Sequence, residues 1–358
     1  MDLSGLAELL VLPGLPGTLL RVEGVMTELV RSADPNLAEP CFRILRGPGK
    51  RVRPALVVAS AACGAGVPDD RKVLAAAAAV EFVHIGSLVH DDIMDNATDR
   101  RGVTTISFLE GPSTALLCGD VLFALANYAA VKVGTDAALE AADTIVALCN
   151  GQAREMADNF DPYRSERSIF SAIEGKTAAL LQTSCRLGGH CADLDVAQID
   201  ALGNYGHAFG MSFQLIDDVL DFVSSKALSG KPVLNDVRCG VYTLPVALAR
   251  VSDRGDELLG ALAPVTDGPT GDANGRGPML SDDQVEAASA ILRSGDSFQR
   301  VLDLAMTYAI EAGEHLASLP DGPTVRGLAR LPRLYLEDQM RTVPDLHALG
   351  LSASVNGR

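Results

Sequence analysis

The segment 71–95, RKVLAAAAAVEFVHIGSLVHDDIMD, constrains the fold more than any other part of the sequence. It has no Gly or Pro before Gly86, and a helical projection of it is apolar on nearly every side. A helix that is apolar all round is one that other elements bury. The sequence therefore predicts a central, buried helix whose last turn carries acidic residues.

Other long segments follow the helical period in the same way, and Ser113 is the expected N-cap of the first of them. These segments are 113–133, 166–189, 197–223 and 284–295. Ser281 and Gln284 have the spacing of a capping box. The Gly/Pro-rich stretch 264–280 predicts a flexible loop, and 346–358 predicts a disordered tail. No alternating pattern is long enough for a strand, so we predict an all-α fold in one domain over residues 1–358.

The formal net charge of −16 argues against a nucleic-acid partner, because phosphate backbones are bound by Lys and Arg. A local basic cluster can still bind a phosphorylated small molecule. The seven Cys are odd in number and form no CxxC, which is typical of small buried side chains in a reducing cytoplasm. The N-terminus lacks a basic signal-peptide region, and no uninterrupted apolar run reaches ~18 residues. We therefore expect a cytoplasmic protein without a transmembrane segment.

Two acidic motifs repeat one spacing: DDIMD begins at Asp91 and DDVLD begins at Asp217. Residues four apart lie on one face of a helix, so Asp91 converges with Asp95 and Asp217 converges with Asp221. Asp92 and Asp218 are rotated to the margin of that face. Converging carboxylates repel unless a cation lies between them, and a hard cation such as Mg²⁺ fits this ligand set.

The structural interpretation of such motifs has to be weighed, because short motifs occur by chance. The sequence DDQVE at 282–286 has nearly the same spacing, but it follows the Ser281 cap, where acids complement the helix dipole. The motifs at 91–95 and 217–221 instead interrupt apolar helices, where carboxylates need partners. We therefore predict metal binding for these two motifs only.

Basic residues stand near turns and motifs that suit an anionic ligand. They are Arg100 and Arg101 after the first acidic motif, Lys50, Arg51 and Arg53 in GPGKRVRP, Lys176 in GKT, and Lys231 in SGKP. The P-loop pattern GxxxxGK[ST] is absent, so GKT is not a nucleotide-binding loop. Together the cations and the acidic motifs predict two diphosphate pockets, one bound through Mg²⁺ and one bound by Lys and Arg directly.

The chain resembles the trans-isoprenyl diphosphate synthases, or polyprenyl synthetases. The resemblance covers roughly residues 40–250 and rests on seven motifs in that family's order: GKRVRP, HIGSLVHDDIMD…RRG, CGDVLFALA, IEGKTAALLQ, GMSFQLIDDVLDF, GKPVLNDV and TLPVALA. It implies a single bundle of mostly antiparallel helices around a central apolar cavity, commonly as a homodimer. It also implies head-to-tail condensation of isopentenyl diphosphate with an allylic diphosphate, with three Mg²⁺ ions.

By this resemblance, Asp91, Asp95 and Asp217 ligate Mg²⁺, with Asp92, Asp218 and Asp221 close by. The positions expected to hold the allylic diphosphate are Arg100, Lys176, Thr177, Gln214 and Lys231. Those expected to hold isopentenyl diphosphate are Lys50, Arg53, His84 and Arg101. The expected catalytic set is Asp91, Asp92, Asp95, Arg100, Lys176, Asp217, Asp218 and Lys231.

One departure is Val241, which stands where many members of the family have a diphosphate-binding lysine. It removes one expected contact but leaves Lys176 and Lys231. His90 is interpreted as structural, packed beside the acids.

Product length is expected to depend on Gly86 and Ser87, which stand five and four residues before Asp91. Both are small, so no aromatic floor is expected at their level, and an all-trans product of C20 or longer follows. A floor formed lower down by Leu122 or Phe123 would give a short-chain product instead.

Two other functions share parts of this pattern. A class I terpene cyclase usually carries an Asn/Ser/Glu metal triad on the later helix and an aromatic-lined cavity, whereas this chain has a second DDxxD and no Trp. A non-catalytic subunit of a heteromeric synthase usually loses acids or basic contacts, and both acidic motifs are complete here. A cation-buffering acidic protein would not explain the basic residues.

Overall fold

The computed structural model describes residues 2–100, 102–223, 235–263, 280–342 and 351. They divide into two compact units. Unit 1 comprises Met1–Leu148, Ala178–Gly210 and Glu311–Leu331, and unit 2 comprises Cys149–Thr177, Met211–Ile310 and Pro332–Arg358. The predicted single domain stays a prediction. Arg101, Lys231, the predicted loop apart from Leu280 and the predicted tail apart from Leu351 lie outside the described residues.

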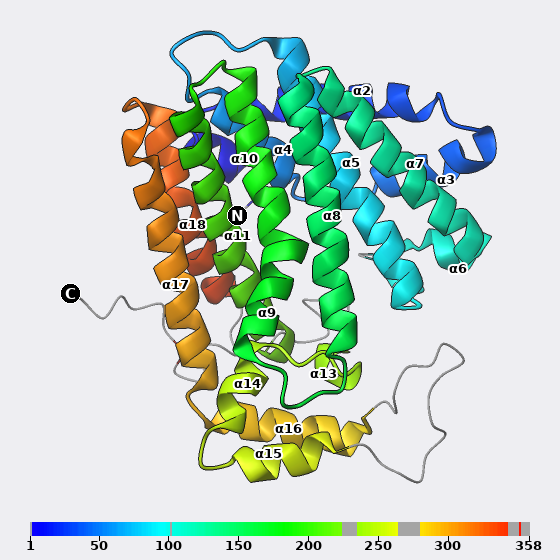
Figure 1. Cartoon of the computed structure of the whole chain (residues 1–358), viewed down its shortest axis with the longest axis vertical. Coiled ribbons are helices and arrows are strands. Elements are labelled where there is room, and N and C mark those ends of the chain that lie inside the picture. Colours follow the sequence, from blue (N-terminus) through cyan, green and yellow to red (C-terminus); the bar gives the residue numbers. More distant parts are fainter. Residues whose placement is uncertain (1, 101, 224–234, 264–279, 343–350, 352–358) are drawn as a thin grey trace. The chain divides into compact units, whose positions relative to one another are not determined.

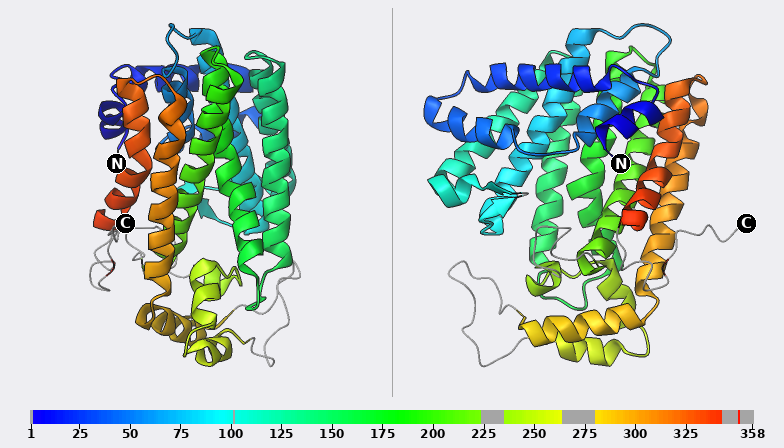
Figure 2. Two further views of the ribbon diagram at one scale, coloured as in Figure 1. Left: turned by 60° about the vertical axis from the view of Figure 1, so that its left-hand side comes forward. Right: turned by 180° about the vertical axis from the view of Figure 1, so that it is seen from behind.

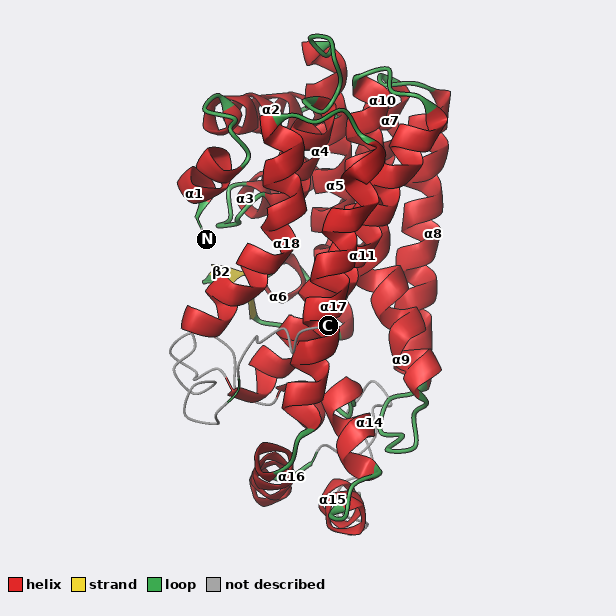
Figure 3. Ribbon diagram, turned by 90° about the vertical axis from the view of Figure 1, so that its left-hand side faces the viewer, coloured by secondary structure: helices red, strands yellow, loops and turns green. Residues whose placement is uncertain are grey.

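Helices make up most of the described chain and nearly all of its regular secondary structure, so the predicted all-α class is confirmed (Figures 1 and 3). The first helices are α1 Leu3–Leu9, α2 Leu15–Val30, α3 Pro35–Leu45, α4 Val52–Ala61, α5 Asp70–Met94, α6 Ile106–Glu110, α7 Pro112–Val131, α8 Thr135–Ala157, α9 Glu166–Ile173, α10 Ala179–Cys191 and α11 Val196–Val223. They are followed by α13 Asn235–Arg238, α14 Leu244–Arg250, α15 Gly255–Leu262, α16 Asp282–Ser294, α17 Ser297–His315 and α18 Pro323–Thr342. A π-helical turn covers Glu174–Ala178 and a 3₁₀ turn covers Leu316–Ser318. The two strands, β1 (Asp99–Arg100) and β2 (Val103–Thr104), form one short antiparallel hairpin.

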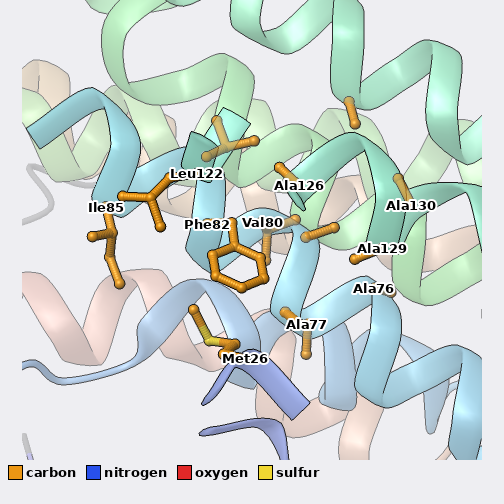
Figure 4. Packing of buried hydrophobic residues seen from close by; sticks show 14 of the residues in the cluster. Met26, Ala76, Ala77, Val80, Phe82, Ile85, Leu122, Ala126, Ala129 and Ala130 are labelled. Carbon is orange, nitrogen blue, oxygen red and sulfur yellow. The ribbon is translucent and has the colours of Figure 1, made fainter. Parts of the chain in front are cut away.

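The core of unit 1 is built around α5, as its apolar sequence predicts. The side chains of residues 75–83 are all buried, and α7 packs along α5 with Leu122, Ala126, Ala129 and Ala130 (Figure 4). Alanine on both helices lets their backbones approach closely, while Phe82 and Leu122 fill the wider gaps. The helices α4 and α10 pack against each other and against α5, and α2 crosses α4 and α5 rather than running along them (Figure 2).

Helix starts were only partly predictable. The capping box of Ser281 and Gln284 is confirmed, with both hydrogen bonds present at the start of α16. The prediction for Ser113 is wrong, because α7 begins at Pro112 and its N-cap is Gly111. Proline is preorganised for the first helical turn and needs no backbone donor there, so it outcompetes the serine one residue later.

The prediction that the Cys side chains are buried needs correction, whereas the expected absence of a transmembrane segment stays a prediction. Five of the seven Cys are buried, but Cys149 is exposed and Cys239 is half-buried. The helices α5 and α7 are long and apolar enough to cross a membrane by length and composition, although neither is an uninterrupted apolar run. Of the most apolar part of each helix, 72% is buried in α5 and only 39% in α7. Thus α5 is a core helix, whereas α7 presents an apolar face to the surface of unit 1.

Candidate active site

The first acidic motif lies at the C-terminal end of α5, in unit 1. Asp91 belongs to the last turn and Asp95 is the C-cap, whose backbone N–H donates to the Asp91 carbonyl at 2.8 Å. Helical geometry therefore continues to Asp95, so Asp91 and Asp95 lie on one face of the helix, and the convergence of their carboxylates stays a prediction. Asp91 is half-buried and Asp95 is exposed, so both carboxylates can reach a ligand from solution.

The middle acid of this motif has a different role from the outer two. Asp92 is buried, and its Oδ1 accepts a hydrogen bond of 2.6 Å from Nε of Arg100. The β1–β2 hairpin holds Arg100 in place, and Asp99 accepts the backbone N–H of Gly102 within its turn. Breaking such an ion pair would cost about 3–5 kcal/mol, because it would leave a buried charge alone. Asp92 therefore orients Arg100 rather than serving as an open metal ligand.

The predicted isopentenyl diphosphate residues of unit 1 lie on a loop and on the two helices that follow it. Lys50 is exposed in the loop before α4, and Arg53 is half-buried in the first turn of α4. His84 is half-buried on α5, seven residues before Asp91. Arg51, which lies between Lys50 and Arg53 in the sequence, is fixed by ion pairs to Glu23 and Glu81.

The predicted chain-length residues have different surroundings. A Cβ atom added at Gly86 would lie 3.0 Å from the ring of Phe123 and 3.3 Å from Cβ of Leu122, so α7 fills the space beside this glycine. Ser87 is half-buried, and its hydroxyl donates to the His84 carbonyl at 2.8 Å. An aromatic ring thus stands beside Gly86, and whether it forms the floor that was not expected at this level stays open to test. This contact could not be predicted from the residues next to Gly86, because it forms between two helices: the missing side chain at Gly86 leaves space that the Phe123 ring of α7 fills.

His90 has the structural role that the sequence predicts. Its ring packs edge-on against Phe123 with centroids 5.4 Å apart, and Nε2 is 3.1 Å from the Leu116 carbonyl of α7. The ring occupies the place that a side chain at Gly119 would need. His90 thus fixes the end of α5 against α7, one residue before the acidic motif.

The second acidic motif lies on α11, in unit 2. Asp217 and Asp221 are half-buried, and the middle acid, Asp218, is buried like Asp92 in the first motif. Gln214 links Asp218 to the GKT motif: its Nε2 donates to Asp218 at 2.8 Å, and its Oε1 accepts from the Thr177 hydroxyl at 2.6 Å. The structure thus joins Thr177, Gln214 and Asp218 by hydrogen bonds, whereas the sequence analysis took them from two separate motifs.

Asp218 lies in an excess of negative charge. Burial raises its pKa well above the usual range, and the charges of Asp236, Asp217 and Glu155 raise it further against the hydrogen bond from Gln214. Its Oδ2 atom is buried and has no hydrogen-bond partner within the described residues. A buried carboxylate of this kind has the surroundings that a nearby cation would stabilise.

Lys176 lies in the π-helical turn, a feature that often marks functional positions in helices. Its Nζ forms an ion pair with Glu155 of α8, which belongs to the same unit. The backbones are close here, because a Cβ at Gly151 would lie 2.8 Å from the Lys176 nitrogen. The sequence analysis did not predict Glu155 as the partner of Lys176. A local indication is that Gly151, where the Lys176 backbone comes close, lies four residues before Glu155 on the same face of α8.

Among the described residues, no group of three or more His, Cys, Asp or Glu side chains is arranged to hold a metal ion. Each acidic motif by itself therefore offers a pair of carboxylates and needs further oxygen ligands. Val241 is half-buried after α13, where its N–H donates to the Asp236 carbonyl.

Two helix-borne carboxylate pairs, with basic side chains on neighbouring elements of each unit, are typical of a class of all-α proteins that bind anionic groups with the help of hard cations. The comparisons with known proteins agree with this class. The family model described as Polyprenyl synthetase matches residues 34–263, which is more than half of the chain. The chain therefore belongs to the polyprenyl synthetase family and is a prenyltransferase.

Individual relatives match over most of their length. Nonaprenyl diphosphate synthase of Mycobacterium tuberculosis is 35% identical, and the match covers 87% of this chain and 89% of that protein. Heptaprenyl diphosphate synthase component 2 of Geobacillus stearothermophilus is 33% identical, with 89% and 94% covered. The crystal structure of polyprenyl synthase from Caulobacter crescentus, complexed with calcium and isoprenyl diphosphate, has a TM-score of 0.80 at 28% identity, with 93% and 96% covered.

Proposed function

We propose that this prenyltransferase condenses isopentenyl diphosphate with an allylic diphosphate, head to tail, to give an all-trans polyprenyl diphosphate of C20 or longer. The observation that carries the proposal is the pattern shared by the two acidic motifs, a buried middle Asp between two more accessible ones on an otherwise apolar helix. This arrangement suits a diphosphate held through divalent cations. The names of the relatives support a polyprenyl product.

The metal in this proposal is Mg²⁺, as three ions, with Asp91, Asp95 and Asp217 as protein ligands. The fit rests on the carboxylate pairs, on the raised pKa of Asp218 and on its buried Oδ2, which has no hydrogen-bond partner within the described residues. Mg²⁺ usually takes one or two carboxylates and completes its octahedron with waters and phosphate oxygens, so a pair of acids per motif suffices. When bound, Mg²⁺ would neutralise charge on the leaving diphosphate.

The chain's own residues would then bind, orient and exclude water. The allylic diphosphate would be held, and its charge stabilised as it leaves, by Arg100, Lys176, Thr177, Gln214 and Lys231. Isopentenyl diphosphate would be held by Lys50, Arg53, His84 and Arg101 so that its C3=C4 bond attacks the allylic cation. The departing diphosphate would take the proton that is lost. The apolar face of α5 would keep water from the cation.

The direct test is to incubate the purified protein with isopentenyl diphosphate and each allylic primer, with and without Mg²⁺, and to read the products by mass spectrometry. We expect diphosphates that grow by C5 units, to C20 or beyond, only when Mg²⁺ is present. Cyclic hydrocarbons would instead indicate a terpene cyclase. An absence of products that a second component restores would indicate a subunit of a two-component enzyme, as the name of the Geobacillus relative suggests for that protein.

We further propose that the protein works in the cytoplasm as a homodimer and that the apolar face of α7 is its interface. Leu117, Tyr128 and Val131 lie along one side of α7 and are each more than half exposed. Phe108 and Leu109 of the adjoining α6 extend the patch. A stable interface buries about 800 Å² per partner, and aromatic and aliphatic side chains at its centre contribute most of the affinity.

A Leu117→Asp variant is expected to weaken the dimer by at least ~100-fold, because a charge would be buried at the centre of the interface. Sedimentation equilibrium measures the change. Leu20→Asp, on α2 of the same unit, is the matched control, since Leu20 is 69% exposed and lies outside the patch. A wild-type monomer, or equal effects of the two variants, would refute the interface.

A further inference from the structure

Arg51 stands between two cations assigned to isopentenyl diphosphate, but it turns away from solvent. Its side chain is only 14% exposed, whereas Lys50 next to it is exposed. Its backbone is left-handed, with φ 48° and ψ 38°, at the N-cap of α4. This conformation is uncommon for a residue other than glycine, so the surrounding contacts must hold it.

Those contacts use all three nitrogens of the guanidinium. Nη1 donates to Glu81 at 2.6 Å, Nη2 donates to the Leu45 carbonyl at 2.6 Å, and Nε donates to Glu23 at 3.2 Å. The partners belong to α5, the end of α3 and α2, while Arg51 itself begins α4. One side chain thus joins four helices of unit 1 at the loop that carries Lys50.

Glu81 is the partner that gives this arrangement a functional meaning. Its side chain is only 4% exposed in the fully buried part of α5, a position that a carboxylate occupies only with a charged or hydrogen-bonding partner. It lies three residues before His84, hence on the same side of α5. Burial alone would lower the pKa of Arg51, but the charge and hydrogen bond of Glu81 raise it, so the guanidinium stays charged.

We propose that Arg51 and Glu81 are positioning residues for the isopentenyl diphosphate site: their ion pair fixes the loop with Lys50 and the start of α4 with Arg53 relative to His84 on α5. The pair does not contact substrate. Its effect is to preform the cation cluster, so that binding does not have to order the loop. The inference rests on the proposed assignment of Lys50, Arg53 and His84 to isopentenyl diphosphate.

The test is steady-state kinetics of an Arg51→Met/Glu81→Gln double variant. Removing both charges avoids leaving one of them alone in the core, which single variants would do. We expect the KM for isopentenyl diphosphate to rise by about tenfold or more, with the KM for the allylic primer within about twofold of wild type. Arg51→Lys keeps the charge but not the three hydrogen bonds of the guanidinium. Its KM for isopentenyl diphosphate should lie between those of wild type and the double variant.

A matched control separates positioning from general stability. Glu140 and Arg186 form an ion pair between α8 and α10 in the same unit, at 2.8 Å, with side chains 19% and 25% exposed. Glu140→Gln should lower the melting temperature without a selective change in either KM. An unchanged KM for isopentenyl diphosphate in the double variant, or equal rises in both KM values, would overturn the proposal.

The proposed function and the positioning role of Arg51 and Glu81 can be wrong independently. Kinetics of wild type and of a Lys50→Ala variant distinguish the two cases. If wild type makes no condensation product, the function itself is wrong. If Lys50→Ala leaves the KM for isopentenyl diphosphate unchanged, the assignment of the pocket is wrong and the positioning role falls with it. If Lys50→Ala raises that KM and the double variant does not, only the positioning role is wrong.

Discussion

Asp91→Ala and Asp217→Ala are each expected to lower Mg²⁺-dependent condensation by about 10³-fold or more, because each removes a ligand for the ions that neutralise the leaving diphosphate. The fold should survive both changes, since each carboxylate is only half-buried.

Single-turnover rates at saturating Mg²⁺, together with melting curves recorded with and without the ion, measure both effects. The chain contains its own control in Asp283, an exposed acid in the first turn of α16, within the sequence DDQVE. Asp283→Ala should leave the rate unchanged and lose only a favourable helix-dipole interaction. Wild-type rates from Asp91→Ala or Asp217→Ala would show that the metal ligands lie elsewhere.

The sequence was sufficient to predict what depends on local spacing. Helical periodicity located α5 and α11, and the four-residue spacing of the outer acids placed them on one face of each helix. Burial of an apolar helix follows from its composition, so the core of unit 1 was predictable as well. The order of motifs was enough to assign the family before any contact between residues was known.

What the sequence did not predict depends on contacts between residues far apart in the chain. The partner of Arg51 is 30 residues away and that of Lys176 is 21 residues away, so no helical or strand period relates them. The pairing of Arg100 with Asp92 needed the hairpin turn. In each case a cation assigned to substrate, or its neighbour, forms an ion pair that the spacing of residues does not predict.

The two acidic motifs also differ in a way that their identical spacing conceals. Asp92 is neutralised by Arg100, whereas burial raises the pKa of Asp218 and the charges of Asp236, Asp217 and Glu155 raise it further. The middle acid of the first motif is therefore a charged partner of Arg100, and the middle acid of the second motif favours its neutral form.

A Phe123→Ala variant is expected to lengthen the product by one or more C5 units, and Ser87→Phe is expected to shorten it. Ser87 shares a helix face with Asp91, so a tail that extends from the diphosphate along α5 passes it first. Gly86 faces α7 instead, where Phe123 fills the space that its missing side chain leaves. Removing the Phe123 ring opens that space to the growing chain. A ring added at position 87 blocks the tail between the acidic motif and that space.

Mass spectrometry of the products from one primer, at a fixed ratio of isopentenyl diphosphate, measures both shifts. Phe42→Ala is the matched control, because Phe42 and Phe123 are both partly buried rings packed on the same core cluster. The two alanine variants should lose similar stability, about 3 kcal/mol at most for a ring that is only partly buried, but Phe42→Ala should leave the product length unchanged. If Phe123→Ala made the wild-type product while Ser87→Phe shortened it, the tail would run along α5 without reaching α7. If neither variant changed the product, the chain would be stopped by residues outside these two helices, and the small residues before Asp91 would have only a packing role.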